Sequence, residues 1–226
     1  MNRRRVLAFL GGAATLGGCS SRDQVPDPAT DAQTPPPDGT ALVSGLEFGH
    51  RIVGAFAADT PATLELHCTN RLDTEIIATT PRGPSLPFPG RFGWDVSGDT
   101  QLLLYPNGEP DLWFQIDENE LVPVSEVLPE ASEDGCWRVP STYDGIADPS
   151  GQISRGIAAE STLTHQYTLY HMYECTPGTY SFSAAVTLTA DGFDTEGSVP
   201  LRLRVVSRDD GEVTIDLFGT PDDDGS

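Results

Sequence analysis

Apolar and polar residues alternate with a period of two along several short segments of the chain, and this spacing is typical of half-buried β-strands. Within 62–70, Leu64, Leu66 and Cys68 fall on one face and polar residues on the other. Similar alternation predicts strands at 75–79, 101–105, 112–116, 162–173, 180–188, 199–205 and 213–217. The side chains expected to face the core are Leu163, Tyr167, Leu169, Tyr173, Tyr180, Phe182, Ala184, Val186, Leu188, Val199, Leu201, Leu203, Val205, Val213, Ile215 and Leu217.

Turn signals separate these segments. Asn107-Gly108 lies between 101–105 and 112–116 and predicts a β-hairpin there, and Asp209-Asp210-Gly211 predicts a turn before the last strand. Seven to nine short antiparallel strands predict an all-β fold, an immunoglobulin-like sandwich, with a closed barrel as the alternative. Segments 81–98 and 138–160 show no clear element, and loops of that length are usually functional or disordered.

The N-terminus has a different pattern, which predicts an export signal at residues 1–18. Arg3 and Arg4 precede an uncharged, mostly apolar stretch at 6–16 that is shorter than the roughly 20 residues of a membrane span. The arginine pair indicates twin-arginine export. Cys19 follows two glycines as in a lipobox, so we expect it to carry the lipid; ordinary signal cleavage is the alternative.

Residues 19–40 are rich in proline and poor in apolar residues, which predicts a linker without a core. Fully extended, such a linker reaches about 60 Å. The sandwich is expected at 41–219, followed by an acidic tail at 220–226.

The charge of the chain is strongly negative. The sequence has 13 basic residues, all of them arginine, against 34 Asp and Glu, for a net charge of −21. Removal of residues 1–18 leaves ten arginines against 34 acids, or −24. This field excludes nucleic acid and anionic headgroups as partners. The acidic excess, the lack of lysine and the export signal together are typical of an extreme halophile.

Cys68, Cys136 and Cys175 remain once Cys19 is assigned to the lipid. Cys136 and Cys175 lie at the ends of segments, so we expect them to form the disulfide, with the other pairings open. Cys68 shares the inward face of its strand and is expected to be a buried free thiol. Core packing is expected for Trp94, Trp113 and Trp137, the last as in immunoglobulin-like cores.

The sequence indicates no enzyme, cofactor or metal. His50, His67, His165 and His171 lack the spacing of metal ligands, and no His follows Cys175 as a blue-copper site requires. The acidic segment 191–196 does not match an EF-hand loop. No hydrolase, zincin or P-loop motif occurs.

The stretch from Leu169 to Phe182 is similar to a pattern in small haloarchaeal lipoproteins exported by the twin-arginine route. There, a strand ends in Cys, and Pro-Gly-x-Tyr-x-Phe begins the next strand. Cys136-Trp137 and the strand ending in Thr69-Asn70 also resemble these proteins. The Pro-Gly-x-Tyr element, here Pro177 to Tyr180, further resembles immunoglobulin-like domains of the BsuPI proteinase-inhibitor type. The resemblance implies the fold, and no inhibitory residue or substrate.

We therefore expect a lipoprotein held on the extracytoplasmic face of the cell membrane by the lipid on Cys19. The expected function is that of a non-enzymatic binding or structural module, monomeric and with an unidentified protein partner at most. The alternative is an accessory subunit of a transporter or protease system, and a hydrolase ranks last.

Overall fold

The computed structural model describes residues 39–80, 91–95, 100–108, 113–115, 120–139, 145–146, 153–172 and 174–218. The chain divides into two compact units, Met1–Pro35 and Pro36–Ser226, and every element given below belongs to the second. Arg3, Arg4 and Cys19 lie outside the described residues.

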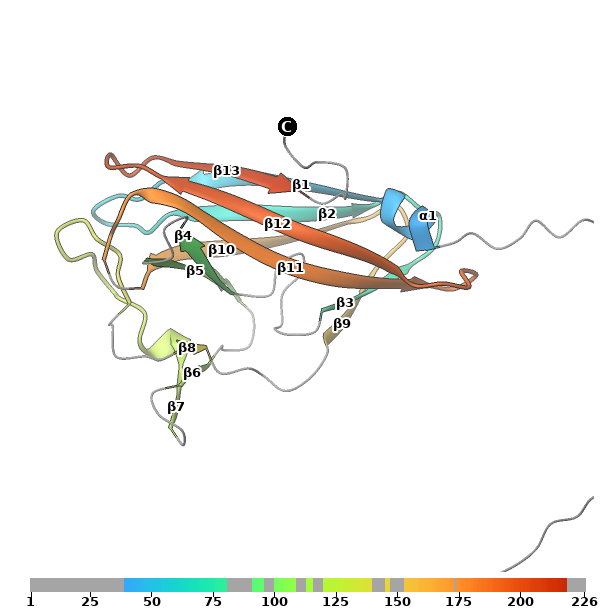
Figure 1. Ribbon diagram of the computed structural model, residues 1–226, viewed down its shortest axis with the longest axis horizontal. Helices are drawn as coiled ribbons and strands as arrows, with labels where there is room; N and C mark the ends of the chain where they lie inside the picture. The colour runs from blue at the N-terminus through green and yellow to red at the C-terminus, as the bar shows by residue number, and fades with distance from the viewer. Residues whose placement is uncertain are drawn as a thin grey trace, which may run out of the picture. The chain divides into compact units, whose positions relative to one another are not determined.

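Antiparallel strands form two layers that face each other across a hydrophobic core (Figure 1). The first layer contains, in spatial order, β1 (Leu46–Gly54), β2 (Thr63–Asn70), β10 (Thr162–His171) and β5 (Gln101–Pro106). The second contains β9 (Ile153–Ile157), β3 (Ile76–Thr80), β11 (Gly178–Ala190), β12 (Gly197–Ser207) and β13 (Val213–Phe218). β4 (Arg91–Asp95) pairs with β5 and β11 and so connects the layers.

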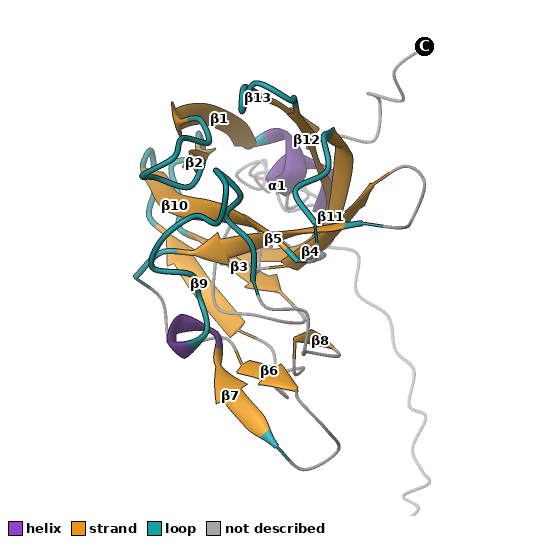
Figure 2. Cartoon of the chain, turned by 90° about the vertical axis from the view of Figure 1, so that its left-hand side faces the viewer, coloured by secondary structure: helices purple, strands orange, loops and turns teal. Residues whose placement is uncertain are grey.

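This strand order is that of an immunoglobulin domain. β1, β2, β10 and β5 take the positions A, B, E and D of one sheet, and β3, β11 and β12 take C, F and G of the other. β13 adds a further strand beside β12. The path of hydrogen-bonded strands ends at β1 and β13, and no ladder joins these two in the described part of the chain (Figure 2). The predicted all-β sandwich is therefore confirmed.

The core between the layers contains most of the side chains that alternation placed inward, together with others that it did not place, among them Leu42, Ile76 and Leu102. Leu64, Leu66 and Cys68 are at most 2% exposed, as predicted for β2. From the facing layer, β11 and β12 contribute Tyr180, Phe182, Val186, Leu188, Val199, Leu201, Leu203 and Val205. Burial of each large apolar side chain contributes about 1.5–3 kcal/mol, so this core supplies the main driving force for folding.

A six-residue helix, α1 (Gly39–Ser44), closes one end of the core. Its Leu42 is fully buried, and the backbone N–H of Gly39 donates to Thr195 Oγ1 at 2.6 Å in the turn between β11 and β12. Gly39 is required here because a Cβ would lie 2.2 Å from the Glu196 carbonyl oxygen. The chain thus enters the fold beside the β11–β12 turn, and Gly39 and Thr40 of the predicted linker belong to α1. Within the described residues, no helix is long and apolar enough to cross a bilayer.

A second hydrophobic cluster lies on the outer face of β10 and β5. Residues 113–139 cover this cluster, and we call them the D–E insertion. The insertion contains β6 (Trp113–Gln115), β7 (Leu121–Pro123) and a 3-10 helix, η1 (Val124–Glu126). β6 pairs with β7 and also with β8 (Gly145–Ile146). The cluster consists of Leu103, Phe114, Val124, Trp137, Val139, Tyr170 and Met172. The end of β10 is therefore buried on both faces, one in the core between the layers and the other in this second cluster.

Several sequence predictions are wrong or incomplete. The hairpin expected across Asn107-Gly108 does not form, because β10 and β4 occupy both edges of β5 while β6 pairs with β7 and β8. Trp113 is 44% exposed rather than in the core. β1 and α1 were not predicted, and the unassigned segments contain β4, β8 and β9. The side chains of Trp94 and Tyr173 lie outside the described residues.

Candidate functional site

A recess of about 410 Å³ opens at the end of the sandwich opposite α1, where the β1–β2 and β10–β11 loops meet the β12–β13 turn. We call it the end recess. Its lining residues are Phe56, Ala57, Ala58, Asp134, Gly135, His171, Cys175, Pro177, Ser207, Arg208, Asp209, Asp210 and Gly211. Its size lies within the range of small-molecule sites, about 300–1,000 Å³.

The β12–β13 turn holds the β1–β2 loop in place. The backbone N–H of Phe56 donates to the Gly211 carbonyl at 3.2 Å. Gly211 has φ +82°, and a Cβ there would lie 2.6 Å from the Phe56 carbonyl oxygen, so no other residue fits. Asp210 Oδ1 accepts the backbone N–H of Glu212 at 3.0 Å, and the predicted Asp-Asp-Gly turn is confirmed.

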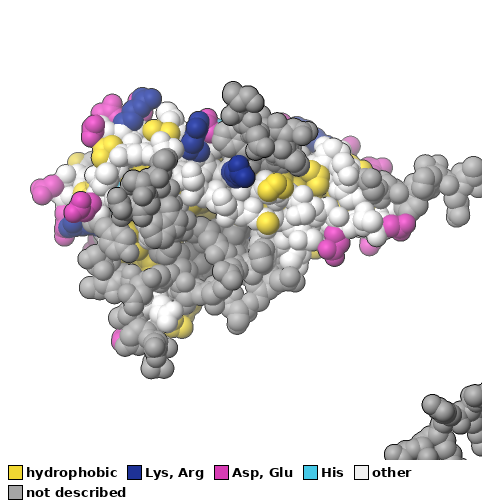
Figure 3. Space-filling model, viewed as in Figure 1, with side chains coloured by type: hydrophobic (Ala, Val, Ile, Leu, Met, Phe, Trp, Pro, Cys, Tyr) yellow, Lys and Arg dark blue, Asp and Glu magenta, His cyan; other side chains and the backbone are white. Residues whose placement is uncertain are grey.

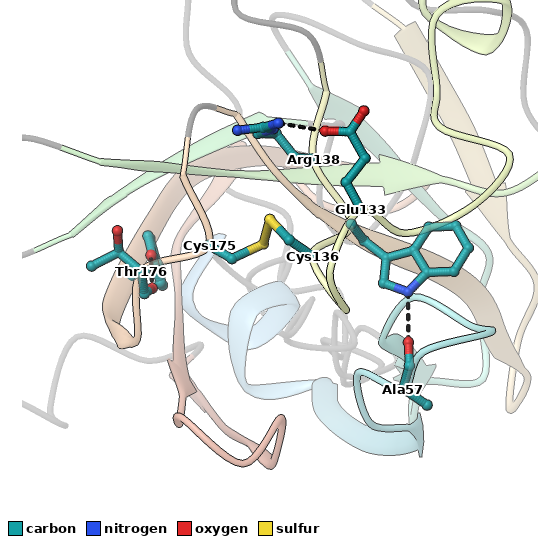
Figure 4. The surroundings of a disulfide bond; sticks show 8 residues. Ala57, Glu133, Cys136, Arg138, Cys175 and Thr176 are labelled. Atoms are coloured by element: carbon teal, nitrogen blue, oxygen red, sulfur yellow. Dashed lines mark hydrogen bonds and ion pairs between the residues drawn. A yellow bond between two sulfur atoms is a disulfide. The ribbon is translucent and has the colours of Figure 1, made fainter.

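The D–E insertion fixes the same loop from the other side (Figure 4). The indole N–H of Trp137 donates to the Ala57 carbonyl at 2.7 Å. The Ser132 hydroxyl donates to the Ala58 carbonyl at 2.7 Å. Trp137 is 4% exposed, as expected, although it packs in the second cluster and not between the two layers. These bonds satisfy the Ala57 and Ala58 carbonyls and attach the insertion to the β1–β2 loop.

The predicted disulfide forms between Cys136 and Cys175 and joins the insertion to the β10–β11 loop (Figure 4). Cys175 lines the end recess. Cys68 is a buried free thiol, as expected. Burial raises the pKa of Cys68 to about 12, so this thiol remains protonated and is a poor nucleophile.

His171, the last residue of β10, lines the end recess and is only 3% exposed. Its ring lies 5.1 Å from that of Phe56 and 6.1 Å from that of Tyr180. Nδ1 is buried and has no hydrogen-bond partner in the described part of the chain. Burial lowers the pKa of His171 to about 4, so the imidazole is neutral at pH 7.

Tyr180 supports this imidazole from within the core. Its hydroxyl donates to the Thr176 carbonyl at 2.5 Å, four residues upstream. A tyrosine at the start of strand F that bonds back to the chain in this way is the tyrosine corner of immunoglobulin-like folds. This hydrogen bond and the Cys136–Cys175 disulfide together hold the loop that carries Cys175 and Pro177.

The rim of the end recess is acidic. Asp134, Asp209 and Asp210 are exposed and form no ion pair within the described residues. Arg208, the basic residue on the rim, forms an ion pair with Glu212. In the space-filling view, acidic side chains are visible at both ends of the strands (Figure 3).

The described residues of the recess do not bring a nucleophile and a base together by a hydrogen bond. Ser207 and His171 both line the recess, yet no hydrogen bond joins them in the part of the chain that the structure describes. Burial alone, and no neighbouring carboxylate, accounts for the shifted pKa of His171. A search of the described residues found no group of three or more His, Cys, Asp or Glu able to hold a metal ion.

The other residues considered from the sequence lie elsewhere. His50 is exposed on β1, and the His67 ring lies over Gly49. On β10, the ring centroids of His165 and Tyr167 are 5.0 Å apart. The acidic segment 191–196 forms the exposed turn at the α1 end. The sequence contained a signal for the β12–β13 turn but none for Phe56 or Asp134, which the fold brings to the recess from loops distant in the chain.

Comparisons of the chain with family models, with curated proteins and with solved structures found no match.

Proposed function

We propose that the protein is a non-enzymatic binding module held on the extracytoplasmic face of the membrane by a lipid on Cys19, with the end recess as its binding site. The observation that carries the proposal is the position of the recess relative to the chain entry. β11 begins one residue after Pro177 of the recess and ends at Ala190, beside the turn that holds α1. Thirteen residues of strand span about 40 Å, so the recess and the entry lie at opposite ends.

This placement supports display. In this proposal the tether joins the sandwich at α1, and the recess lies at the end of the sandwich away from that junction. The signal features at Arg3, Arg4 and Cys19 and the proline-rich linker supply the export and the tether in this proposal.

A second candidate, an accessory subunit of a larger membrane complex, is supported by the small sheet of the D–E insertion. Trp113 is 44% exposed and Leu121 is 52% exposed, and their strands β6 and β7 pair directly. Exposed aromatic and aliphatic side chains on one sheet are typical of protein contacts. In this candidate, the insertion contacts the complex and the recess remains the ligand site.

The anchoring is tested by the substitution Cys19→Ala in the full chain. We expect the variant either to be released from the membrane or to remain as unprocessed precursor, because the thiol that carries the lipid is gone. Cell fractionation with mass spectrometry of the N-terminus measures this. Cys68→Ala, which alters a buried thiol, is the matched control and should stay membrane-bound. Mature Cys19→Ala protein in the membrane fraction would refute the anchor.

A further inference from the structure

The rim of the end recess has a local excess of negative charge. Asp134, Asp209 and Asp210 carry three carboxylates, and the guanidinium of Arg208 is already paired with Glu212. Charges at the mouth of a cleft raise the local concentration of ligands of the opposite sign. The mouth therefore favours a cation and repels an anion.

The floor of the recess suits an organic cation more than a hydrated metal ion. His171 is 3% exposed and its Nδ1 lacks a partner in the described residues, so the ring is a buried polar group set among apolar ones. A neutral imidazole does not repel a cation. The Phe56 ring and Pro177 add apolar surface on which the body of an organic cation can pack.

We infer that the end recess binds a small organic cation, an ammonium group on a short apolar body, with the charge at the carboxylates of Asp134, Asp209 and Asp210 and the body against Phe56 and His171. This inference rests on the proposed function and adds the ligand class. The recess volume of about 410 Å³ accommodates such a molecule.

Three probes of one shape and different charge test the ligand class: benzylammonium, benzyl alcohol and benzoate. Each is titrated into the chain from Ser20 to Ser226, which lacks the lipidated Cys19, at the lowest KCl concentration that keeps it folded, and backbone amide shifts are followed by NMR. We expect benzylammonium to bind at least about fivefold more tightly than benzyl alcohol, and benzoate to leave the recess amides unchanged.

Two triple variants with equal charge changes separate the rim from the general field of the protein. D134N, D209N and D210N remove the rim carboxylates; Asn tolerates the φ of +53° at residue 134 and keeps the Oδ1 acceptor at residue 210. The control, D191N, D194N and E196Q, alters exposed residues at the α1 end. We expect the rim variant to bind benzylammonium about fivefold more weakly and benzyl alcohol as before. The control variant should match the wild type.

The possible outcomes separate an error in the ligand class from an error in the proposed binding site. If all three probes shift the recess amides with similar affinity, or if both triple variants weaken benzylammonium equally, the cation inference is wrong while the binding site stands. If no probe shifts the amides of Phe56, Gly135 and Gly211, both the cation inference and the proposed site are wrong.

Discussion

In molar KCl the mature chain is expected to melt at least about 10 °C higher than in dilute buffer, which corresponds to a gain of about 3–5 kcal/mol in the free energy of unfolding. Ten arginines face 34 carboxylates after removal of residues 1–18, so at least 24 carboxylates have no arginine to pair with. The ion pairs Arg204–Asp216 and Arg51–Glu65 lie at the surface, where such pairs contribute little. Salt shortens the range of the remaining repulsion from about 10 Å at 0.1 M to about 3 Å at 1 M. Thermal unfolding followed by circular dichroism measures the change.

Acid provides the control for this prediction. In dilute buffer, lowering the pH towards the pI of about 4.2 neutralises carboxylates and should restore part of the gain, most clearly in a His171→Phe variant, which lacks the opposing protonation of His171. A melting temperature that does not depend on KCl would show that repulsion between carboxylates does not limit stability, and the halophilic origin inferred from the composition would be wrong.

In molar KCl, where that repulsion is screened, lowering the pH from 7 to 4 should reduce the free energy of unfolding by about 3 kcal/mol through His171 alone. Its pKa is lowered from 6.5 to about 4 by burial. As the pH falls below 6.5, the unfolded chain takes up a proton that the folded chain excludes, so the stability due to neutral His171 is complete above pH 6.5 and is lost down to pH 4. Urea unfolding at each pH measures the slope.

His171→Gln and His171→Phe isolate this contribution, since neither side chain titrates in this range. Between pH 6.5 and 4, the free energy of unfolding of both variants is expected to depend less steeply on pH than that of the wild type, whatever their stability at pH 7. His50→Gln, an exposed site on β1, should keep the wild-type slope. If the wild type and the His171 variants have parallel profiles, His171 is not buried as a neutral group.

Alternation sufficed to predict the strands whose two faces have different surroundings. β2, β11 and β12 have one face in the core and one in solvent, and their spacing shows it. β1 was missed because it lies at the edge of the path and is largely exposed, with glycines at 49 and 54, so its apolar residues do not mark one face. The second half of β10 is buried on both faces by the D–E insertion, which period-two spacing does not reveal.

The hairpin at Asn107-Gly108 failed for a different reason. Gly108 has the positive φ, +75°, that such a turn requires, so the local signal was correct. Pairing was decided by tertiary contacts, because Phe114 of β6 is drawn into the second cluster while β5 pairs within the sandwich. Turn chemistry predicts where the chain reverses but does not establish which strands pair.

The end recess was not predictable from the sequence. Phe56, Asp134, His171 and Gly211 come from four loops or strand ends that only the folded chain brings together. The Cys136–Cys175 pair was the residue-level prediction closest to it, because both cysteines lie in the loops that form its wall.

The most direct test of the binding site is an NMR fragment screen with cationic, neutral and anionic fragments on the chain from Ser20 to Ser226, which lacks the lipidated Cys19. We predict that the fragments that bind shift mainly the amides of Phe56, Gly135 and Gly211, at the end of the sandwich opposite α1. Binding mainly at the exposed Trp113 and Leu121 face, or beside α1, with those three amides unchanged, would contradict the proposal that the end recess is the binding site.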